Sequence, residues 1–154
     1  MMLTINKATK IIGNGPHEKK TLLQKVDLKL QPGEFVTVVG GNGAGKSTLF
    51  NCISGSLPLT SGQILIDDQD VTQLSEEKRA AYLSRVFQDP KMGTAPRMTV
   101  AENLLLAQRR GQKRNLHLRQ LQAQKDVYYQ LCQEVGNGLE QHLDTPTGNL
   151  SGGQ

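Results

Sequence analysis

The feature that most constrains this chain is a glycine-rich run, Gly40-Gly41-Asn42-Gly43-Ala44-Gly45-Lys46-Ser47-Thr48, which fits the spacing G-x-x-x-x-G-K-[ST]. The run is preceded by the apolar, β-branched residues 35–39, which predict a buried parallel strand. Residues 47–54 follow it and predict a helix, with Gly55 placed as the C-terminal cap. A strand, a glycine-rich loop and a helix are therefore expected in this order.

This order is that of a P-loop, whose glycines let the backbone curl around an anion. Successive N–H groups and the N-terminus of the following helix would then point at a β-phosphate. Lys46 is expected to bridge the β- and γ-phosphates, and the Ser47 hydroxyl to be a ligand of Mg²⁺. By position, the Thr48 hydroxyl lies within reach of the α-phosphate. The sequence therefore predicts a site for a nucleoside triphosphate with Mg²⁺.

The length and composition fit a single packed domain with an aliphatic α/β core. The chain has 154 residues, of which 36% are hydrophobic and only 4% aromatic. No apolar run approaches the ~20 residues that cross a bilayer, and the start lacks the long apolar region of a signal peptide. We therefore expect a cytosolic protein whose membrane role, if any, needs a separate partner. Cys52 and Cys132 form no CxxC motif and are expected to be reduced and structural.

The net charge of +4 is concentrated in one segment. Residues 109–125 hold six basic side chains and no acidic one: Arg109, Arg110, Lys113, Arg114, Arg119 and Lys125. Such a segment could contact nucleic acid or an anionic membrane surface. No aromatic residue is interleaved with it, so we favour a solvated loop and helix face.

The first half of the chain predicts an antiparallel layer around the P-loop. Residues 3–12 and 21–30 read as two strands, and residues 63–66 as a third that ends at Asp67-Asp68. An apolar strand ending in two acids could instead be the carboxylate strand that holds Mg²⁺ in many P-loop enzymes. Two more polar residues follow at once, so we interpret Asp67-Asp68 as a hairpin turn.

The second half predicts one further strand and then helices. Ser75 is expected to cap a short helix, and residues 84–87 to form a strand before a loop over 88–97. Thr99 and Glu102 have the spacing of a capping box at the start of a helix through Ala107. Apolar residues at helical spacing predict a long helix over about 116–135; they are Leu118, Leu121, Tyr128, Leu131 and Val135.

The chain closes on Leu150-Ser151-Gly152-Gly153-Gln154, about a hundred residues after the P-loop. This run resembles the signature motif of the ATP-binding cassette (ABC) ATPases. Gln88, in Val86-Phe87-Gln88-Asp89, stands where this family has its Q-loop glutamine. The resemblance covers essentially the whole chain.

The resemblance implies an α/β fold: a RecA-like P-loop NTPase core with an N-terminal antiparallel β subdomain and a helical subdomain, the C-terminal part of the core being missing. Residues 1–91 would form the core and β subdomain, 92–149 the helical subdomain, and 150–154 the signature motif. Gly40 to Thr48 would bind ATP, and Gln88 would contact Mg²⁺ or the attacking water. Ser151, Gly152, Gly153 and Gln154 would contact the ATP held by a second ATPase subunit, in a head-to-tail dimer.

The resemblance further implies a motor subunit of a membrane transporter, lying on the inner face of the membrane through a separate permease. An importer is favoured because no membrane domain is fused to this chain, and the solute would contact other subunits. The alternative is a soluble ABC ATPase acting on nucleic acid or ribosomes, for which the basic segment 109–125 is the only support.

The chain departs from the family pattern at two places. Where the family commonly stacks an aromatic residue on adenine, the best match here is Ile12, an aliphatic side chain. The family's acidic strand and switch histidine follow the signature motif, whereas His17, His117 and His142 all precede it. We therefore expect residues 1–154 to bind Mg-ATP weakly and to hydrolyse it poorly.

Overall fold

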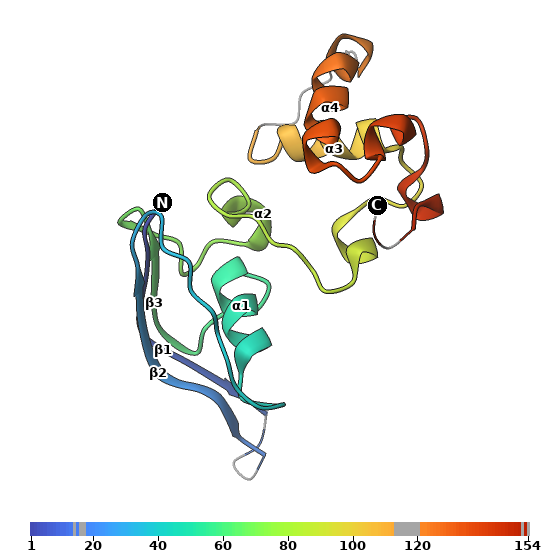
Figure 1. Ribbon diagram of the computed structural model, residues 1–154. Coiled ribbons are helices and arrows are strands. Elements are labelled where there is room, and N and C mark those ends of the chain that lie inside the picture. Colours follow the sequence, from blue (N-terminus) through green and yellow to red (C-terminus); the bar gives the residue numbers. More distant parts are fainter. Residues whose placement is uncertain (14, 16–17, 113–120, 152, 154) are drawn as a thin grey trace. The chain divides into compact units, whose positions relative to one another are not determined.

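The computed structural model describes residues 1–13, 15, 18–112, 121–151 and 153. The chain divides into two compact units, Met1–Leu83 and Ser84–Gln154, and each is described on its own (Figure 1). The structure bears out the expected α/β class, with an antiparallel layer in the first unit and helices in both. The predicted subdomain boundaries at residues 91 and 149 stay predictions.

The first unit contains a four-stranded antiparallel sheet. Its strands are β1 (Leu3–Ile12), β2 (Lys20–Leu30), β3 (Ser61–Ile66) and β4 (Gln69–Asp70), in the order β2-β1-β3-β4. The strands predicted over residues 3–12, 21–30 and 63–66 are thus confirmed. β1 is one of the two inner strands, and its Ile5 pairs with Leu28 of β2 on one side and with Ile64 of β3 on the other (Figure 1).

The core of the first unit lies between this sheet and helix α1 (Lys46–Ser54). Ile5, Ile64 and Ile66 of the sheet are buried together with Cys52 of α1. Leu49 and Ile53 of the same helix, partly buried, pack against this cluster. Burial of these aliphatic side chains is the main force that holds α1 to the sheet.

Asp67 and Asp68 form the turn between β3 and β4. Both have positive φ, 46° and 64°, the left-handed pair that a two-residue hairpin turn requires. Ile66 pairs with Gln69 across the turn, and the Asp67 carboxylate accepts a 2.7 Å hydrogen bond from the backbone N–H of Met2. The interpretation of these acids as a hairpin turn is therefore confirmed.

Two predicted strands are not formed. Residues 35–39 and 84–87 have no strand partner among the described residues, and Phe35 and Val86 are 94% and 96% exposed. A β-strand exists through hydrogen bonds to a neighbouring strand, so an apolar run by itself is not sufficient. The helix expected after Ser75 is present as α2 (Glu76–Arg79), a single turn without a side-chain cap bond.

The second unit is helical. It contains α3 (Val100–Gln108), α4 (Leu121–Val135) and three short 3-10 helices, η1 (Pro90–Gly93), η2 (Leu139–His142) and η3 (Thr147–Asn149). Its buried core is Val100, Ala101, Tyr128, Cys132 and Leu143.

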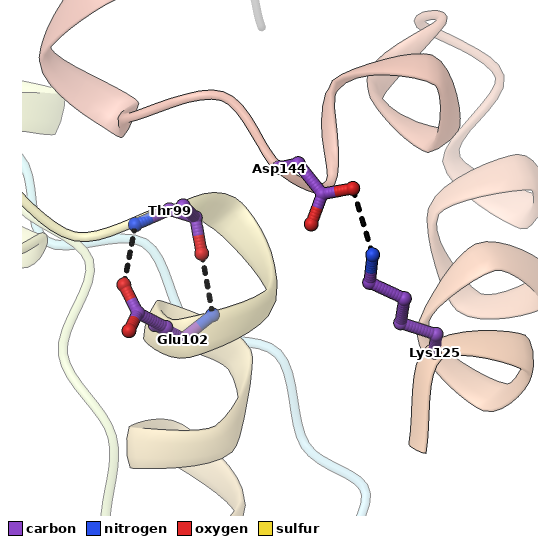
Figure 2. Close-up of polar contacts among 4 residues, drawn as sticks. All are labelled: Thr99, Glu102, Lys125 and Asp144. Atoms are coloured by element: carbon purple, nitrogen blue, oxygen red, sulfur yellow. Dashed lines mark hydrogen bonds and ion pairs between the residues drawn. The ribbon is translucent and has the colours of Figure 1, made fainter. Parts of the chain in front are cut away.

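The capping box that starts α3 is confirmed. The Thr99 hydroxyl accepts from the N–H of Glu102 at 3.2 Å, and the Glu102 carboxylate accepts from the N–H of Thr99 at 3.0 Å (Figure 2). An ion pair of 2.7 Å joins Lys125 of α4 to Asp144, which follows η2 (Figure 2). This pair links α4 to the segment that leads towards Leu150.

Helix α4 is confirmed from residue 121, while the part predicted over 116–120, with Leu118, lies outside the described residues. Its buried side chains are Tyr128 and Cys132, whereas Leu131 is 49% and Val135 66% exposed. The helical period was therefore predicted correctly, and of the predicted set Tyr128 is buried and Leu121 packs against the core, whereas Leu131 and Val135 are exposed.

Candidate functional site

The glycine-rich loop has the backbone that its sequence predicts. Gly43 and Gly45 have φ of 80° and 89°, in the left-handed region that favours glycine. A Cβ added to Gly45 would come within 2.8 Å of the carbonyl oxygen of Leu22 in β2. Gly45 is thus required both for its dihedral angle and for its close approach to the sheet.

The loop leads directly into α1, with Gly45 as the N-cap and Lys46 as the first helical residue. The N–H of Leu49 donates to the carbonyl of Gly45 at 2.8 Å and closes the first turn. The N–H groups of a helix's first turn have no acceptor within the helix, and the helix dipole places partial positive charge there. With a glycine as N-cap, this end is open for an anion such as phosphate.

Lys46 folds back over the loop. Its ammonium donates to the carbonyl oxygens of Gly40 and Gly41, at 2.6 and 2.8 Å. Ser47 is exposed and Thr48 is half-buried beside it. The amine is therefore held at the mouth of the loop, where it could exchange two carbonyl acceptors for phosphate oxygens.

Arg79 holds the opposite end of α1 from the glycine-rich loop, a contact that the sequence did not indicate. It is 1% exposed, and its guanidinium donates to the carbonyls of Cys52 and Ile53 at the C-terminal end of α1. Burial lowers the pKa of this guanidinium, which interacts favourably with the charge of Asp70. In the sequence, Arg79 ends the charged run Glu76-Glu77-Lys78-Arg79. Such a run is typical of a solvated helix surface, so no local signal indicates that Arg79 is buried.

Ile12 lies at the end of β1, paired with Lys20 and 42% exposed. The preceding pair, Ile11 with Thr21, stands next to Leu22, whose carbonyl contacts Gly45. Lys20, the partner of Ile12, is therefore close along β2 to Leu22, which contacts the glycine-rich loop at Gly45. Contact of Ile12 with a base stays a prediction.

Gln88 and the signature residues belong to the second unit. Gln88, Ser151 and Gly153 are exposed, and Gly152 and Gln154 lie outside the described residues. The structure therefore brings the P-loop residues together within the first unit. It does not place Gln88 or the signature residues relative to them.

The segment before the signature motif is anchored along the start of α3. The N–H of Thr147 donates to the carbonyl of Met98 and that of Gly148 to Pro96, both at 3.0 Å. The N–H of Val100 donates to the carbonyl of Thr145 at 3.1 Å. These hydrogen bonds hold residues 145–148 against residues 96–100, and so they position the segment that continues to Ser151.

Asn103 organises the loop before α3. Its amide oxygen accepts from the N–H of Ala95 at 2.8 Å. Its amide nitrogen donates to the carbonyls of Ala95, Met98 and Thr99, at 3.0 to 3.2 Å. One side chain thus closes the loop over Ala95–Thr99, a role that the sequence did not indicate.

A cavity of about 460 Å³ lies within the second unit. Its apolar wall includes Val100, Leu104 and Ala107 of α3, and its polar lining includes Asp89 and Ser151. It is open to solvent, and it combines residues that follow Gln88 with residues of the signature segment.

The described residues contain no cluster of three or more His, Cys, Asp or Glu side chains that could hold a metal ion by themselves. Mg²⁺ commonly binds through one or two protein oxygens together with nucleotide phosphates and water. The exposed hydroxyl of Ser47, at the start of α1, fits the role of such a protein oxygen. The site therefore suits Mg²⁺ that arrives with a nucleotide.

The basic segment is described only at its ends. Arg109 and Arg110 are exposed, Lys125 is paired with Asp144, and Lys113, Arg114 and Arg119 lie outside the described residues. Across the part of the chain that the structure describes, no helix is long and apolar enough to cross a membrane.

Comparison with known proteins gives a consistent family match. Residues 23–154 match the family described as ABC transporter. The tyrosine transport ATP-binding protein of Clostridioides difficile (strain R20291) is 42% identical over 153 residues, 99% of this chain and 61% of that relative. The ribose import ATP-binding protein RbsA of Streptococcus agalactiae serotype Ia is 38% identical over 135 residues, 86% of this chain and 26% of the relative.

Solved structures agree. A dimeric structure of the ATP-binding cassette MJ0796, in a post-hydrolysis state bound to ADP and Pi, aligns with a TM-score of 0.73 and 25% identity, covering 99% of this chain and 64% of that one. The ADP conformation of MJ1267, an ATP-binding cassette of an ABC transporter, aligns with a TM-score of 0.72 and 26% identity, covering 98% and 59%. This chain thus spans less than two thirds of the length of these relatives.

Proposed function

This chain belongs to the ABC transporter family, and we propose that it is the ATP-binding part of a subunit that powers solute import. The observation that carries the proposal is the loop before α1: two glycines with positive φ, an open helix N-terminus and Lys46 held at the mouth. These are the groups that bind a triphosphate in a P-loop. Gly40 to Thr48 would hold the phosphates, and Ser47 would hold Mg²⁺.

The remaining site residues have roles that the family resemblance supplies. Gln88 would contact Mg²⁺ or the attacking water and link the nucleotide to the permease. Ser151, Gly152, Gly153 and Gln154 would contact ATP bound to a second copy in a head-to-tail dimer. Ile12 would give the base a small apolar contact rather than an aromatic stack, so discrimination among bases is expected to be weak.

Hydrolysis requires a group that orients water, beyond positioning and charge neutralisation by Mg²⁺. By resemblance, the acid that does this follows the signature motif, outside residues 1–154. We therefore expect these residues alone to bind Mg-ATP and to turn it over slowly.

The partner would be a separate transmembrane permease that holds this subunit at the inner face of the membrane. Two relatives, named for tyrosine transport and ribose import, support a transport role. The cavity beside α3 offers an apolar wall next to the residues that follow Gln88, and a permease segment could insert there. Replacing Ala107, an exposed residue of that wall, by Arg should reduce co-purification with the permease and leave Mg-ATP binding unchanged.

The decisive experiment is Mg-ATP binding, measured by calorimetry on the wild type and on Lys46→Ala. Removing the ammonium should weaken binding at least about tenfold, since a hydrogen bond to a charged group is lost. Lys29→Ala, an exposed position of β2, is the charge-matched control and should bind as the wild type does. Equal affinities for Lys46→Ala and the wild type would overturn the proposed function.

A further inference from the structure

The C-terminal end of α1, opposite its phosphate-binding end, is held by the buried guanidinium of Arg79. One terminal nitrogen donates to the carbonyls of Cys52 and Ile53, at 2.7 and 2.9 Å. These carbonyls belong to the last turn of the helix, where acceptors lack partners within the helix. The positive charge also lies at the negative end of the helix dipole.

The same guanidinium binds the chain between β4 and α2. Its Nε donates to the carbonyl of Leu74 at 3.1 Å, and its second terminal nitrogen to that of Thr72 at 2.7 Å. Arginine presents five N–H donors in one rigid plane, while a lysine ammonium has three on a flexible stem. The planar guanidinium therefore donates to four carbonyls from two segments at once, which a lysine ammonium cannot do.

Gly55 provides the space for this contact. It is the C-cap of α1, with φ of +88°. A Cβ at this position would lie 2.9 Å from Nε of Arg79 and 3.2 Å from the carbonyl oxygen of Leu74. A side chain there would push the guanidinium away from its acceptors.

Helix α1 is short enough for its two ends to be coupled. Its nine residues span about 13 Å at 1.5 Å per residue, and Lys46 is the first of them. At this N-terminal end Gly45 abuts the Leu22 carbonyl, so α1 is held by a backbone contact at one end and by the Arg79 side chain at the other. A tilt permitted by loss of the Arg79 contacts would change where the first-turn N–H groups and Lys46 point.

We propose that Arg79 is a positioning residue for nucleotide binding: it fixes the tilt of α1 and thereby aims the P-loop donors at phosphate. This inference rests on the proposed function, in which that loop binds Mg-ATP. A merely structural arginine would stabilise the fold and leave the affinity of the folded protein for nucleotide unchanged. Positioning requires both the affinity and the loop geometry to change.

The test compares the wild type with Arg79→Lys, which keeps the charge, and Gly55→Ala, which keeps every donor but displaces the guanidinium. Ile66→Val is the control, because it weakens the same core from β3, at a side chain with 0% exposure. Mg-ATP affinity is measured by calorimetry at 10 °C, at which circular dichroism must show each variant folded. The backbone amide resonances of Gly43, Gly45 and Lys46 are recorded without nucleotide.

Arg79→Lys should bind Mg-ATP about tenfold more weakly, as expected for the loss of one well-aimed hydrogen bond. Its three P-loop amide resonances should move, Gly55→Ala should change both readouts in the same direction, and Ile66→Val should change neither. If either folded variant binds like the wild type with unmoved resonances, Arg79 is only structural and the inference is overturned. If the wild type itself does not bind Mg-ATP, the proposed function is overturned. This result is distinct from failure of the Arg79 inference, because it is obtained without any Arg79 variant.

Discussion

Gly62 of β3 lies against Ala8 of β1 so closely that a Cβ on the glycine would be 2.7 Å from the Cα of Ala8. The same Cβ would be 2.5 Å from the carbonyl oxygen of Lys7. Here β1 bulges: the register with β3 shifts between Asn6 and Thr9, and Lys7 has a φ of 48°. The bulge brings two backbones together at a point where only glycine fits.

Gly62→Ala should therefore destabilise the first unit strongly. The φ of Gly62 is +98°, so alanine adds backbone strain to a clash with main-chain atoms that cannot rotate away. We expect the free energy of unfolding to fall by about 3 kcal/mol, as for overpacking combined with a strained φ. Urea denaturation followed by circular dichroism measures it.

The matched control is Gly33→Ala. Gly33 also has a positive φ, +84°, but an added Cβ would meet no atom within 4 Å. Only the dihedral penalty of roughly 1–2 kcal/mol should remain. Equal losses in the two variants would show that the close contact with Ala8 contributes nothing.

The features predicted correctly from the sequence are those set by local geometry. Gly55 at the end of α1, the capping box of Thr99 and Glu102, and the turn at Asp67 depend on a few neighbouring residues, so a short window contains all the relevant chemistry. The P-loop is of this kind, because the glycine dihedral angles and the start of α1 are encoded within one run.

The features that the sequence did not reveal depend on contacts with residues that are distant along the chain. Residues 35–39, an apolar run, and residues 84–87 were both predicted to be strands but form none, because a strand needs hydrogen bonds to a neighbouring strand. The residues next to Arg79 in the sequence are typical of a helix surface, but its guanidinium donates hydrogen bonds to the carbonyls of Cys52 and Thr72. In α4 the period indicates a helix, but packing against α3 decides that Cys132 rather than Leu131 is buried.

Asn103→Ala should open the loop before α3. The substitution removes one acceptor and one donor group that together make four hydrogen bonds to Ala95, Met98 and Thr99. We expect a loss of about 2 kcal/mol, because backbone groups in a half-buried loop are left without partners. Tryptic cleavage after Arg97, within this loop, should become faster than in the wild type. Asn149→Ala, at an exposed position, should not change the cleavage rate.

Thr99→Ala should weaken the start of α3 by about 1 kcal/mol, the usual effect of losing an N-cap side chain. The lost bond is the one from the N–H of Glu102 to the Thr99 hydroxyl. Thr99→Ser keeps a hydroxyl at the same position and should restore most of the stability. Urea midpoints of the three proteins measure this, and a Thr99→Ser midpoint as low as that of Thr99→Ala would contradict the capping role.

Stability should fall at alkaline pH because of Cys52. Burial raises the pKa of its thiol above the ordinary value of 9.0, while the charges of Lys10 and Arg79 oppose the shift. The folded protein then keeps the thiol proton at a pH where the unfolded chain has lost it. The resulting stabilisation is complete below about pH 9 and disappears as the pH rises through the higher folded pKa.

The measurement is the free energy of unfolding of the wild type and of Cys52→Ala between pH 7.5 and about 10.5. The variant should be less stable at neutral pH, since the buried sulfur leaves a cavity at a side chain that is 1% exposed. Its stability should decline less steeply above pH 9, because one proton-linked group is absent, although Cys132, whose pKa burial also raises, still titrates in both proteins. Parallel pH profiles would mean that Cys52 ionises equally in the folded and unfolded chains, so that its burial between α1 and the sheet does not protect the thiol.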